Sequence, residues 1–293
     1  MKGKRGKMSL EQYSKATRET AENLRIIDDA LFRLMAEREG VCQEILRTLL
    51  DMPSLDVVNV NSQSVVKSLH REVTLDALCI LENGEYVNIE MQKGACNDDI
   101  ARTRFHAASL TSAYTPKGTD FADIPQVKIL YITEYDALNN KQAVTHVKRC
   151  MKTNDGFIPI SDKEDIFFAN TAIKENSDKS ELLQLFLRKD AFDDAKFPEL
   201  SKAVKYFKET EGGRSEVCKT VENYAMDYAL DYAKTYAKKE RIDAIQNMLE
   251  LGLSKEQILT KYSEEEIKMA EFMIYNCSFF TDEYCKCLFF GVI

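Results

Sequence analysis

Apolar residues in the first fifty positions recur at helical spacing. They fall three or four residues apart between Thr20 and Leu50, and Gly40 interrupts the series. This pattern predicts two amphipathic helices with a break near Gly40. The second helix should stop at residues 51–53, Asp-Met-Pro, because the residue before a proline disfavours helical backbone.

Short runs of branched and aromatic residues follow and predict four β-strands, at residues 55–60, 73–81, 86–92 and 127–133. A helical pattern stands between the third and fourth runs. Asn97 or Asp98 can cap this helix, which should continue toward Tyr114 and end before Pro116. Because a strand-helix-strand crossover normally joins parallel neighbours, we expect a mixed sheet with an antiparallel hairpin and a parallel addition.

The second half of the chain changes from strand to helix. Two further strands are expected at residues 144–151 and 166–171, linked through the turn region at Asn154-Asp155-Gly156. From Ser180 onward the spacing of apolar residues is helical, including a long stretch at 216–251. We therefore divide the chain into a flexible basic N-terminus (1–18), an α/β core (19–175) and a helical C-terminal region (176–293).

A four-residue repeat lies inside the long helical stretch. The sequence YAMD-YALD-YAKT-YAKK places tyrosines four apart, each followed by alanine. Each step advances about 40° beyond a full helical turn, so the aromatic stripe winds slowly around the helix. One interpretation is a packing or self-association face on which alanine lets backbones approach. The alternative is a stacking ladder for nucleic acid, supported by Lys234, Lys238, Lys239 and Arg241.

Composition limits the class of protein. Hydrophobic residues make up 44% and charged residues 30%, as in soluble globular proteins rather than disordered ones. No apolar window approaches the ~20 residues of a membrane span, so a cytoplasmic protein is expected. The eight cysteines form no C-x-x-C pair and indicate neither disulfides nor zinc. The net charge of -8 argues against a surface that attracts phosphates throughout, although a local basic strip can still hold DNA.

The segment from Arg71 to Gln92, REVTLDALCILENGEYVNIEMQ, carries the candidate chemistry. Asn83-Gly84 marks a hairpin with two possible registers. A two-residue loop would mix polar and apolar side chains on both faces. A three-residue loop (82–84) places Asp76 opposite Glu90 and separates the faces, so we favour it. The apolar face would then hold Leu75, Ala77, Cys79, Leu81, Val87, Ile89 and Met91, and the other face Asp76, Glu90 and Gln92.

Two opposed carboxylates with no Lys or Arg between them repel each other unless they are protonated or hold a cation. Oxygen ligands of this kind suit Mg²⁺ or Mn²⁺. Gln92 points the same way as Glu90 and could orient a metal-bound water. The alternative is a half-exposed strand edge that carries two solvated acids.

These residues resemble those of the PD-(D/E)XK nuclease superfamily, specifically its transposase-like branch related to recombination-promoting nucleases. In that branch the final lysine of the motif is commonly glutamine, which Gln92 matches. Further matches are Asp76, Ile89-Glu90-Met91-Gln92, Asp29 with Phe32 and Arg33, Arg104, the segment 117–133 and the segment 252–258.

The resemblance implies a restriction-endonuclease-like α/β core, a mixed sheet flanked by helices, that hydrolyses phosphodiester bonds of DNA. It implies a metal ion, Mg²⁺ with Mn²⁺ as a substitute, held by Asp76, Glu90 and the Met91 carbonyl, with Gln92 as a third catalytic residue. Arg104 is the candidate contact to phosphate or DNA. Two further candidates are weighed against plainer alternatives. Glu44 could supply an additional acid of the first helices, and the alternative is an ordinary surface glutamate. His106 could assist as an acid or base, but a histidine on a helix face is more often structural. The rival reading is a catalytically inactive DNA-binding or self-associating protein derived from this fold.

Overall fold

A computed structural model describes residues 10–67, 72–95 and 98–276 of the chain. It divides into two compact units, Met1–Val221 and Glu222–Ile293, each described by itself below. Within the described residues, no helix combines the length and apolar character that a bilayer crossing requires.

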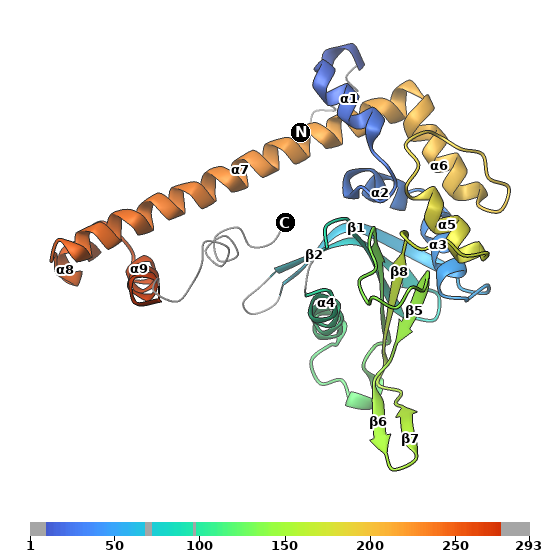
Figure 1. Ribbon diagram of the computed structural model, residues 1–293, viewed down its shortest axis with the longest axis horizontal. Helices are drawn as coiled ribbons and strands as arrows, with labels where there is room; N and C mark the ends of the chain where they lie inside the picture. The colour runs from blue at the N-terminus through green and yellow to red at the C-terminus, as the bar shows by residue number, and fades with distance from the viewer. Residues whose placement is uncertain (1–9, 68–71, 96–97, 277–293) are drawn as a thin grey trace. The chain divides into compact units, whose positions relative to one another are not determined.

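The first unit is built on a six-stranded sheet in the order β1-β2-β3-β4-β8-β5 (Figure 1). β1 pairs with β2 and β2 with β3 in antiparallel fashion, whereas β3, β4 and β8 run parallel and β5 returns antiparallel. The predicted mixed sheet is therefore confirmed. The strands are β1 (Val57–Lys67), β2 (Glu72–Leu81), β3 (Tyr86–Gln92), β4 (Val127–Thr133), β5 (Val144–Val147) and β8 (Glu164–Asn170).

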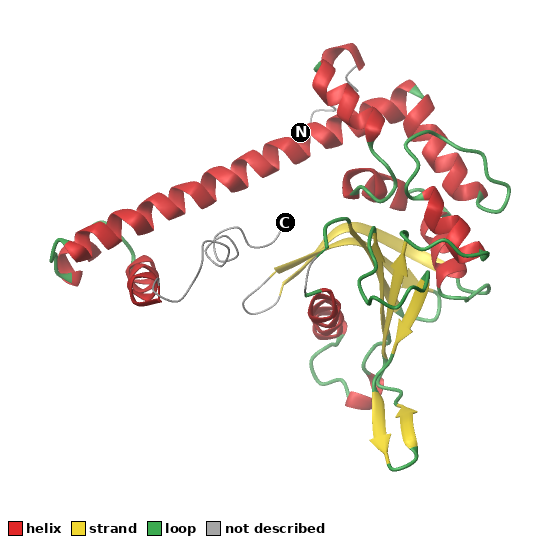
Figure 2. Cartoon of the chain, viewed as in Figure 1, coloured by secondary structure: helices red, strands yellow, loops and turns green. Residues whose placement is uncertain are grey.

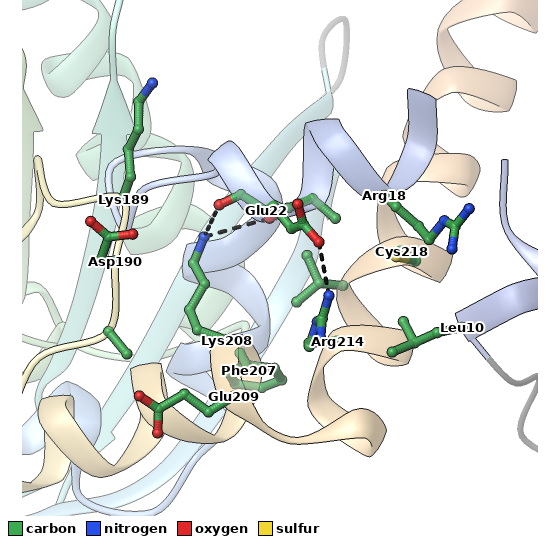
Figure 3. A pocket seen from close by; sticks show the side chains of 13 residues that line it. Leu10, Arg18, Glu22, Lys189, Asp190, Phe207, Lys208, Glu209, Arg214 and Cys218 are labelled. Atoms are coloured by element: carbon green, nitrogen blue, oxygen red, sulfur yellow. Dashed lines mark hydrogen bonds and ion pairs between the residues drawn. The ribbon is translucent and has the colours of Figure 1, made fainter. Parts of the chain in front are cut away.

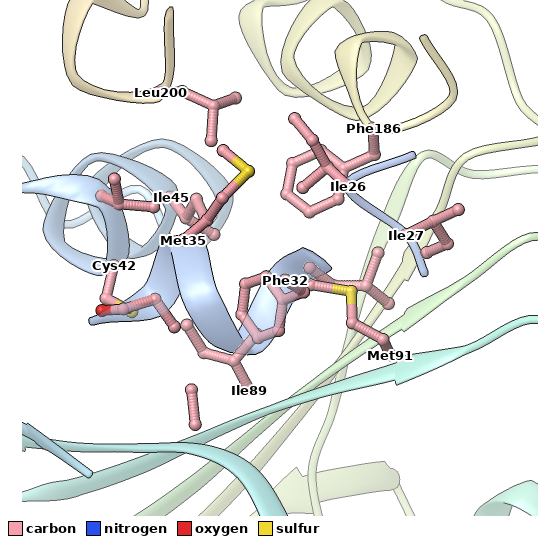
Figure 4. Packing of buried hydrophobic residues seen from close by; sticks show 14 of the residues in the cluster. Ile26, Ile27, Phe32, Met35, Cys42, Ile45, Ile89, Met91, Phe186 and Leu200 are labelled. Atoms are coloured by element: carbon pink, nitrogen blue, oxygen red, sulfur yellow. The ribbon is translucent and has the colours of Figure 1, made fainter. Parts of the chain in front are cut away.

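Helices cover both faces of this sheet. On one face α4 (Asp99–Tyr114) buries Ala107 and Leu110 against Leu78 and Ile129. On the other face lie α2 (Asp29–Ala36), α3 (Val41–Leu49), α5 (Asp178–Leu185) and α6 (Pro198–Glu209) (Figure 1). Their shared core surrounds Phe32, which Figure 4 shows beside Ile89 of β3. Burial of this apolar surface is the main force that holds the unit together.

The N-terminal helices differ from the prediction. The expected first helix is two helices, α1 (Lys15–Asn23) and α2, joined by a loop, after a short 3₁₀ turn at Leu10–Gln12. Ile26 and Ile27 of this loop are fully buried, and the Ile27 N–H donates to the Phe186 carbonyl. The loop thus fills the core with apolar residues whose spacing imitates a helix. The predicted break at Gly40 is confirmed, because Gly40 has φ +81° ahead of α3.

The strand boundaries also differ in two places. β1 continues to Lys67 because its polar second half pairs with β2 at the edge of the sheet, where no alternating apolar pattern is needed. The single strand expected at 144–151 is two strands: β5 joins the main sheet, and β6 (Cys150–Thr153) forms a separate hairpin with β7 (Gly156–Pro159). The turn region at 154–156 connects these two short strands, rather than β5 and β8. The remaining element of the first unit is a 3₁₀ turn at Phe121–Asp123.

After β8 the described chain is helical, as predicted (Figure 2). α5 and α6, which the sequence analysis assigns to the C-terminal region, pack against α3 in the first unit. α7 (Glu211–Glu250) begins in the first unit and continues into the second. Of the predicted N-terminal segment 1–18, residues 1–9 lie outside the described residues, and Lys15 begins α1. The cysteine-rich end, residues 277–293, also lies outside them.

The second unit is a small helical assembly. Ile242 and Ile245 near the end of α7 pack with Ile258 of α8 (Lys255–Leu259) and with Ile267 of α9 (Glu264–Asn276). Ser254 caps α8, since its hydroxyl accepts from the Gln257 N–H while the Gln257 side chain bonds back to the Ser254 N–H. This capping box satisfies donors that would otherwise lack partners at the helix start.

Candidate functional site

The hairpin of β2 and β3 has the predicted register. Ala77 pairs with Ile89 and Cys79 with Val87, and the Leu81 N–H donates to the Glu85 carbonyl at 2.9 Å. The loop therefore contains three residues, with Gly84 at φ +82°. Glycine suits this position because the left-handed region strains other residues. The same register places Asp76 next to Glu90.

At the two acids, the backbone ladder gives way to side-chain contacts. Beyond the Ala77–Ile89 pair, the Met91 N–H donates to Asp76 Oδ2 at 2.9 Å, and the Asp76 N–H lies 3.4 Å from Glu90 Oε1. Each carboxylate thus accepts a backbone N–H group of the opposite strand. The register brings Asp76, Glu90 and Met91 together, as the sequence predicts.

One residue of the predicted apolar face is misplaced. Leu75 packs in the core under α4, whereas Ala77, Cys79 and Leu81 pack in the core of the other face. Pairing with β3 is recorded only from Ala77 onward, so the outer part of β1 and β2 is a two-stranded ribbon. The pairing of β1 with β2 skips Gln63 and Asp76, and Gln63 has φ +54°, so the alternation of faces is interrupted between Leu75 and Ala77.

Both acids are buried: Asp76 is 6% and Glu90 is 8% exposed. The alternative of two solvated acids on a strand edge is therefore wrong. Burial raises the pKa of Asp76 well above its usual range, and the charges of Glu90 and Asp29 raise it further. Arg33 and the Met91 N–H oppose this shift. Burial is the largest cause of the shift, and a bound cation would offset the part that comes from the charges of Glu90 and Asp29.

Arg33 supplies positive charge that the sequence analysis did not foresee. Its Nη2 lies 2.8 Å from Asp76 Oδ1, and its Nε lies 2.6 Å from Asp29 Oδ1. Neither strand carries this cation; it comes from α2, which lies over the hairpin. The spacing of Asp29 and Arg33, four residues apart on one helix face, indicates their own ion pair, but it does not indicate the contact of Arg33 with Asp76.

Glu90 has its own polar surroundings. The fully buried Asn88 donates from Nδ2 to Glu90 Oε1 at 2.6 Å, and His106 Nδ1 of α4 lies 3.5 Å from the same oxygen. Asn88 was also missed, although an amide in an otherwise apolar strand is a usable signal because buried polar groups need partners. His106 faces the acid pair, which favours a role at the site over a purely structural one.

Three other predicted residues are not brought to the acid pair by any contact recorded among the described residues. The Gln92 amide donates to the Gly94 carbonyl at 2.8 Å. Arg104 is exposed on α4, about 200° around the helix from His106. Glu44 instead accepts the backbone N–H groups of Glu199 and Leu200 at the start of α6, so it stabilises a helix N-terminus.

Lys93 directly follows Gln92, but it does not supply the lysine that the motif lacks. Its ammonium group pairs with Asp28, which also pairs with Arg25 at 3.6 Å. Arg25 in turn holds Glu134, which follows β4. The positive charge of Lys93 is thus balanced by Asp28, in a network of ion pairs beside the end of β3.

The donor set fits a hard divalent cation. The described residues contain no group of three or more His, Cys, Asp or Glu side chains that could hold a metal. Asp76 and Glu90 offer two carboxylates, and the Met91 carbonyl would be a third oxygen donor. A carboxylate has about four lone-pair sites, so the contacts to Arg33 and Met91 leave accepting capacity on Asp76. Oxygen donors with room for water are what Mg²⁺ and Mn²⁺ take.

A separate pocket of about 420 Å³ has none of these residues in its wall. Figure 3 shows Arg214 meeting Glu22 there, at 2.8 Å. The Lys208 ammonium donates to the backbone carbonyls of Glu22 and Leu24, and its burial lowers the pKa. Both cations already have partners within the protein. Their contacts join the end of α1 to α6 and α7.

A comparison with models of known families matches residues 39–248 to the family described as PD-(D/E)XK nuclease family transposase. The match spans well over half of the 293 residues. The chain belongs to this family. Its six-stranded mixed sheet flanked by helices is the expected restriction-endonuclease-like fold, so the predicted family and fold class are confirmed. No curated protein and no solved structure matched the chain.

Membership indicates a nuclease or transposase-like function with DNA as the substrate. PD-(D/E)XK nucleases typically use divalent metal ions, which agrees with the oxygen donors found at the acid pair. The matched range includes Asp76, Glu90 and Gln92, whereas Asp29 and Arg33 lie before its first residue.

Proposed function

We propose that this PD-(D/E)XK protein is a metal-dependent endonuclease that hydrolyses phosphodiester bonds of DNA in the cytoplasm. The observation that carries the proposal is the pair of buried carboxylates, Asp76 and Glu90, on neighbouring strands of a nuclease fold, where Asp76 accepts the Met91 N–H and Glu90 accepts the Asp76 N–H. Two neighbouring buried acids are costly unless a cation balances them, and a nuclease offers a reason to keep them.

In this proposal Asp76, Glu90 and the Met91 carbonyl hold Mg²⁺, with Mn²⁺ as a substitute. When bound, the ion polarises the phosphate and lowers the pKa of the attacking water. The protein orients both carboxylates before a metal binds. The Met91 N–H holds Asp76, and the Asn88 amide holds Glu90. Such supporting contacts typically change metal affinity about 10- to 100-fold when removed.

Gln92 is the third catalytic residue of the proposal and orients the attacking water. Its neutral amide cannot offset the charge that develops on the phosphate, as a lysine would. In this proposal the metal and nearby cations offset the negative charge that develops on the phosphate. Arg33 already contacts Asp76, whereas Arg104, exposed on α4, is a candidate contact to the DNA backbone.

The experiment is magnesium-dependent nicking of plasmid DNA by the full chain and by Asp76→Asn and Glu90→Gln. Both substitutions keep the side-chain shape and remove the charge. We expect each to lower the cleavage rate at least about 100-fold, the scale seen when one charge-stabilising group of an active site is lost. Glu82→Gln is the matched control, because Glu82 is exposed in the turn of the same hairpin.

Direct titration with Mn²⁺ separates metal binding from cleavage. The wild type and Glu82→Gln should bind the ion, and Asp76→Asn should bind it more weakly. Equal cleavage by wild type and Asp76→Asn would reject the site. Absence of cleavage by the wild type, together with unchanged Mn²⁺ binding in the variants, would favour the inactive DNA-binding protein.

A second copy of the chain is the other partner that we propose. Support comes from α7, where Tyr228, Tyr232 and Tyr236 of the four-residue repeat are more than half exposed. Exposed aromatic surface of this kind usually marks an interaction site.

A further inference from the structure

The two oxygens of the Glu90 carboxylate have different surroundings. Oε1 accepts from Asn88 Nδ2 at 2.6 Å, the Asp76 N–H lies 3.4 Å from it, and His106 Nδ1 lies 3.5 Å from it. Among the described residues, no contact to Oε2 is recorded. The protein therefore holds one oxygen of Glu90 and leaves the other to accept a ligand.

The Nδ1 atom of His106 is buried and makes no hydrogen bond to any described residue. Glu90 Oε1 lies beside it at 3.5 Å, just beyond the ordinary hydrogen-bond range. Buried polar atoms are almost always hydrogen-bonded, and an ionised carboxylate can only accept. Nδ1 can therefore satisfy both groups only if it carries the hydrogen and comes about 0.5 Å closer. Contacts in active sites are often this long before a ligand binds.

The helix that carries His106 is fixed to the sheet beside Glu90. Asp99 lies about two turns before His106 and therefore on the same side of α4. Its carboxylate accepts the hydroxyls of Tyr131 and Tyr135, at 2.9 and 2.6 Å. Tyr131 is also the register partner of Glu90 on β4. The strand next to Glu90 thus sets the rotation of α4, which keeps the imidazole on the side of the acid.

We infer that His106 is a positioning residue of the nuclease site. Its Nδ1–H donates to Glu90 Oε1 and, together with the Asn88 amide, directs Oε2 toward the metal ion. His106 then neither takes nor gives a proton during cleavage. This inference rests on the proposed metal site and adds the residue that orients Glu90 and the oxygen that binds the ion.

Three substitutions of His106 test where the donor sits, with direct titration of the full chain by Mn²⁺ as the measurement. Asparagine carries its amide nitrogen on Cγ, as histidine carries Nδ1, whereas glutamine carries it one carbon farther out. His106→Leu should raise the Mn²⁺ dissociation constant about tenfold or more, because supporting contacts of this kind change metal affinity about 10- to 100-fold. His106→Asn should restore most of the affinity, and His106→Gln should resemble His106→Leu.

Ser112→Ala is the matched control, because Ser112 is exposed on the same helix. Equal affinity of the wild type and His106→Leu would overturn the inference and leave the acid pair as the metal site. Restoration by His106→Gln but not by His106→Asn would place the donor on Nε2 and overturn it as well. Absence of Mn²⁺ binding by the wild type would instead overturn the metal site together with this inference.

The hydrogen on Nδ1 can also be observed in the wild type, without any effect of a substitution on folding. The chain has three histidines, so nitrogen-15 labelling of histidine gives few NMR signals, and those absent from His106→Asn belong to His106. At neutral pH, Nδ1 of His106 should carry a hydrogen both without metal and with saturating Mg²⁺. A hydrogen on Nε2 alone, in either state, would overturn the inference.

Discussion

Two regions depart from ordinary solvation in opposite ways. One is the acid hairpin of β2 and β3, and the other is the Tyr-Ala stripe of α7, the four repeated tyrosines at 224, 228, 232 and 236 with the alanine after each. In the hairpin, Asp76 and Glu90 are charged residues placed inside the protein, and Arg33, Asn88 and the Met91 N–H satisfy them. Along the stripe, Tyr228, Tyr232 and Tyr236 each have more than half of their surface exposed. The hairpin holds its partners within the fold, whereas Tyr228, Tyr232 and Tyr236 present aromatic surface to solvent.

The comparison shows two ways in which a sequence reveals function. A buried charge is costly, so its supporting contacts must be built before a ligand arrives. An exposed apolar surface costs less and needs no support within the chain, so it can be encoded by a simple repeat. Substitutions in the hairpin should therefore alter folding and chemistry together, whereas those in the stripe should alter association alone.

The largest expected difference is in side-chain truncation. Phe32 is fully buried beside the acid hairpin, so Phe32→Ala should lower the free energy of unfolding by about 3–5 kcal/mol. Tyr228→Ala should change it by no more than about 0.5 kcal/mol while it weakens association. Urea denaturation of dilute protein measures both. A typical point substitution costs about 1 kcal/mol. A loss above about 2 kcal/mol for Tyr228→Ala would therefore show that other parts of the chain cover this tyrosine.

Removal of Arg33 should have the next largest effect. Arg33→Ala leaves Asp76 buried without its cation, and breaking such a pair typically destabilises a protein by about 3 kcal/mol. The double variant Arg33→Ala with Asp76→Asn should recover part of this loss, because the orphaned charge is gone. Chemical denaturation of the four proteins forms a double-mutant cycle. Additive losses would mean that Arg33 and Asp76 do not interact.

The sequence predicted the hairpin more completely than its surroundings. The register followed from one rule, that apolar side chains share a face, and Gly84 fixed the loop. The contacts of Arg33 and His106 could not be derived in the same way, because they depend on how α2 and α4 dock across the sheet. Local periodicity carries no information on such docking. The same limit explains the first helix, where buried loop residues such as Ile27 imitated helical spacing.

The titration of Asp76 should contribute to the pH dependence of the free energy of unfolding. Burial and the charge of Glu90 raise its pKa in the folded state, so folding favours the protonated acid. Its stabilising contribution is then complete below the unfolded pKa of about 3.9 and is lost as the pH rises through the folded value.

Asp76→Asn removes this titration. Without metal, the variant should gain stability relative to wild type as the pH rises, by at most about 1.4 kcal/mol per pH unit. Saturating Mg²⁺ should stabilise the wild type at neutral pH and lose this effect on acidification, since protons compete with the ion. Denaturation curves at several pH values measure both trends. A difference that does not vary with pH would place the Asp76 pKa near its ordinary value.

The smallest expected effect is that of Gly84→Ala. This substitution tests whether the turn or the buried face determines the pairing register of β2 and β3. Gly84 has φ +82°, and a side chain there would meet no atom within 4 Å, so Gly84→Ala should cost only the backbone strain of about 1 kcal/mol. Gly40 has a similar φ of +81°, but a Cβ there would lie 2.7 Å from Glu199 Cγ, so Gly40→Ala should cost more. If the buried face sets the register, Gly84→Ala keeps Asp76 beside Glu90 and retains cleavage. If the turn sets it, a one-residue slip would move the acids to opposite faces, and cleavage would be lost while most of the stability remained.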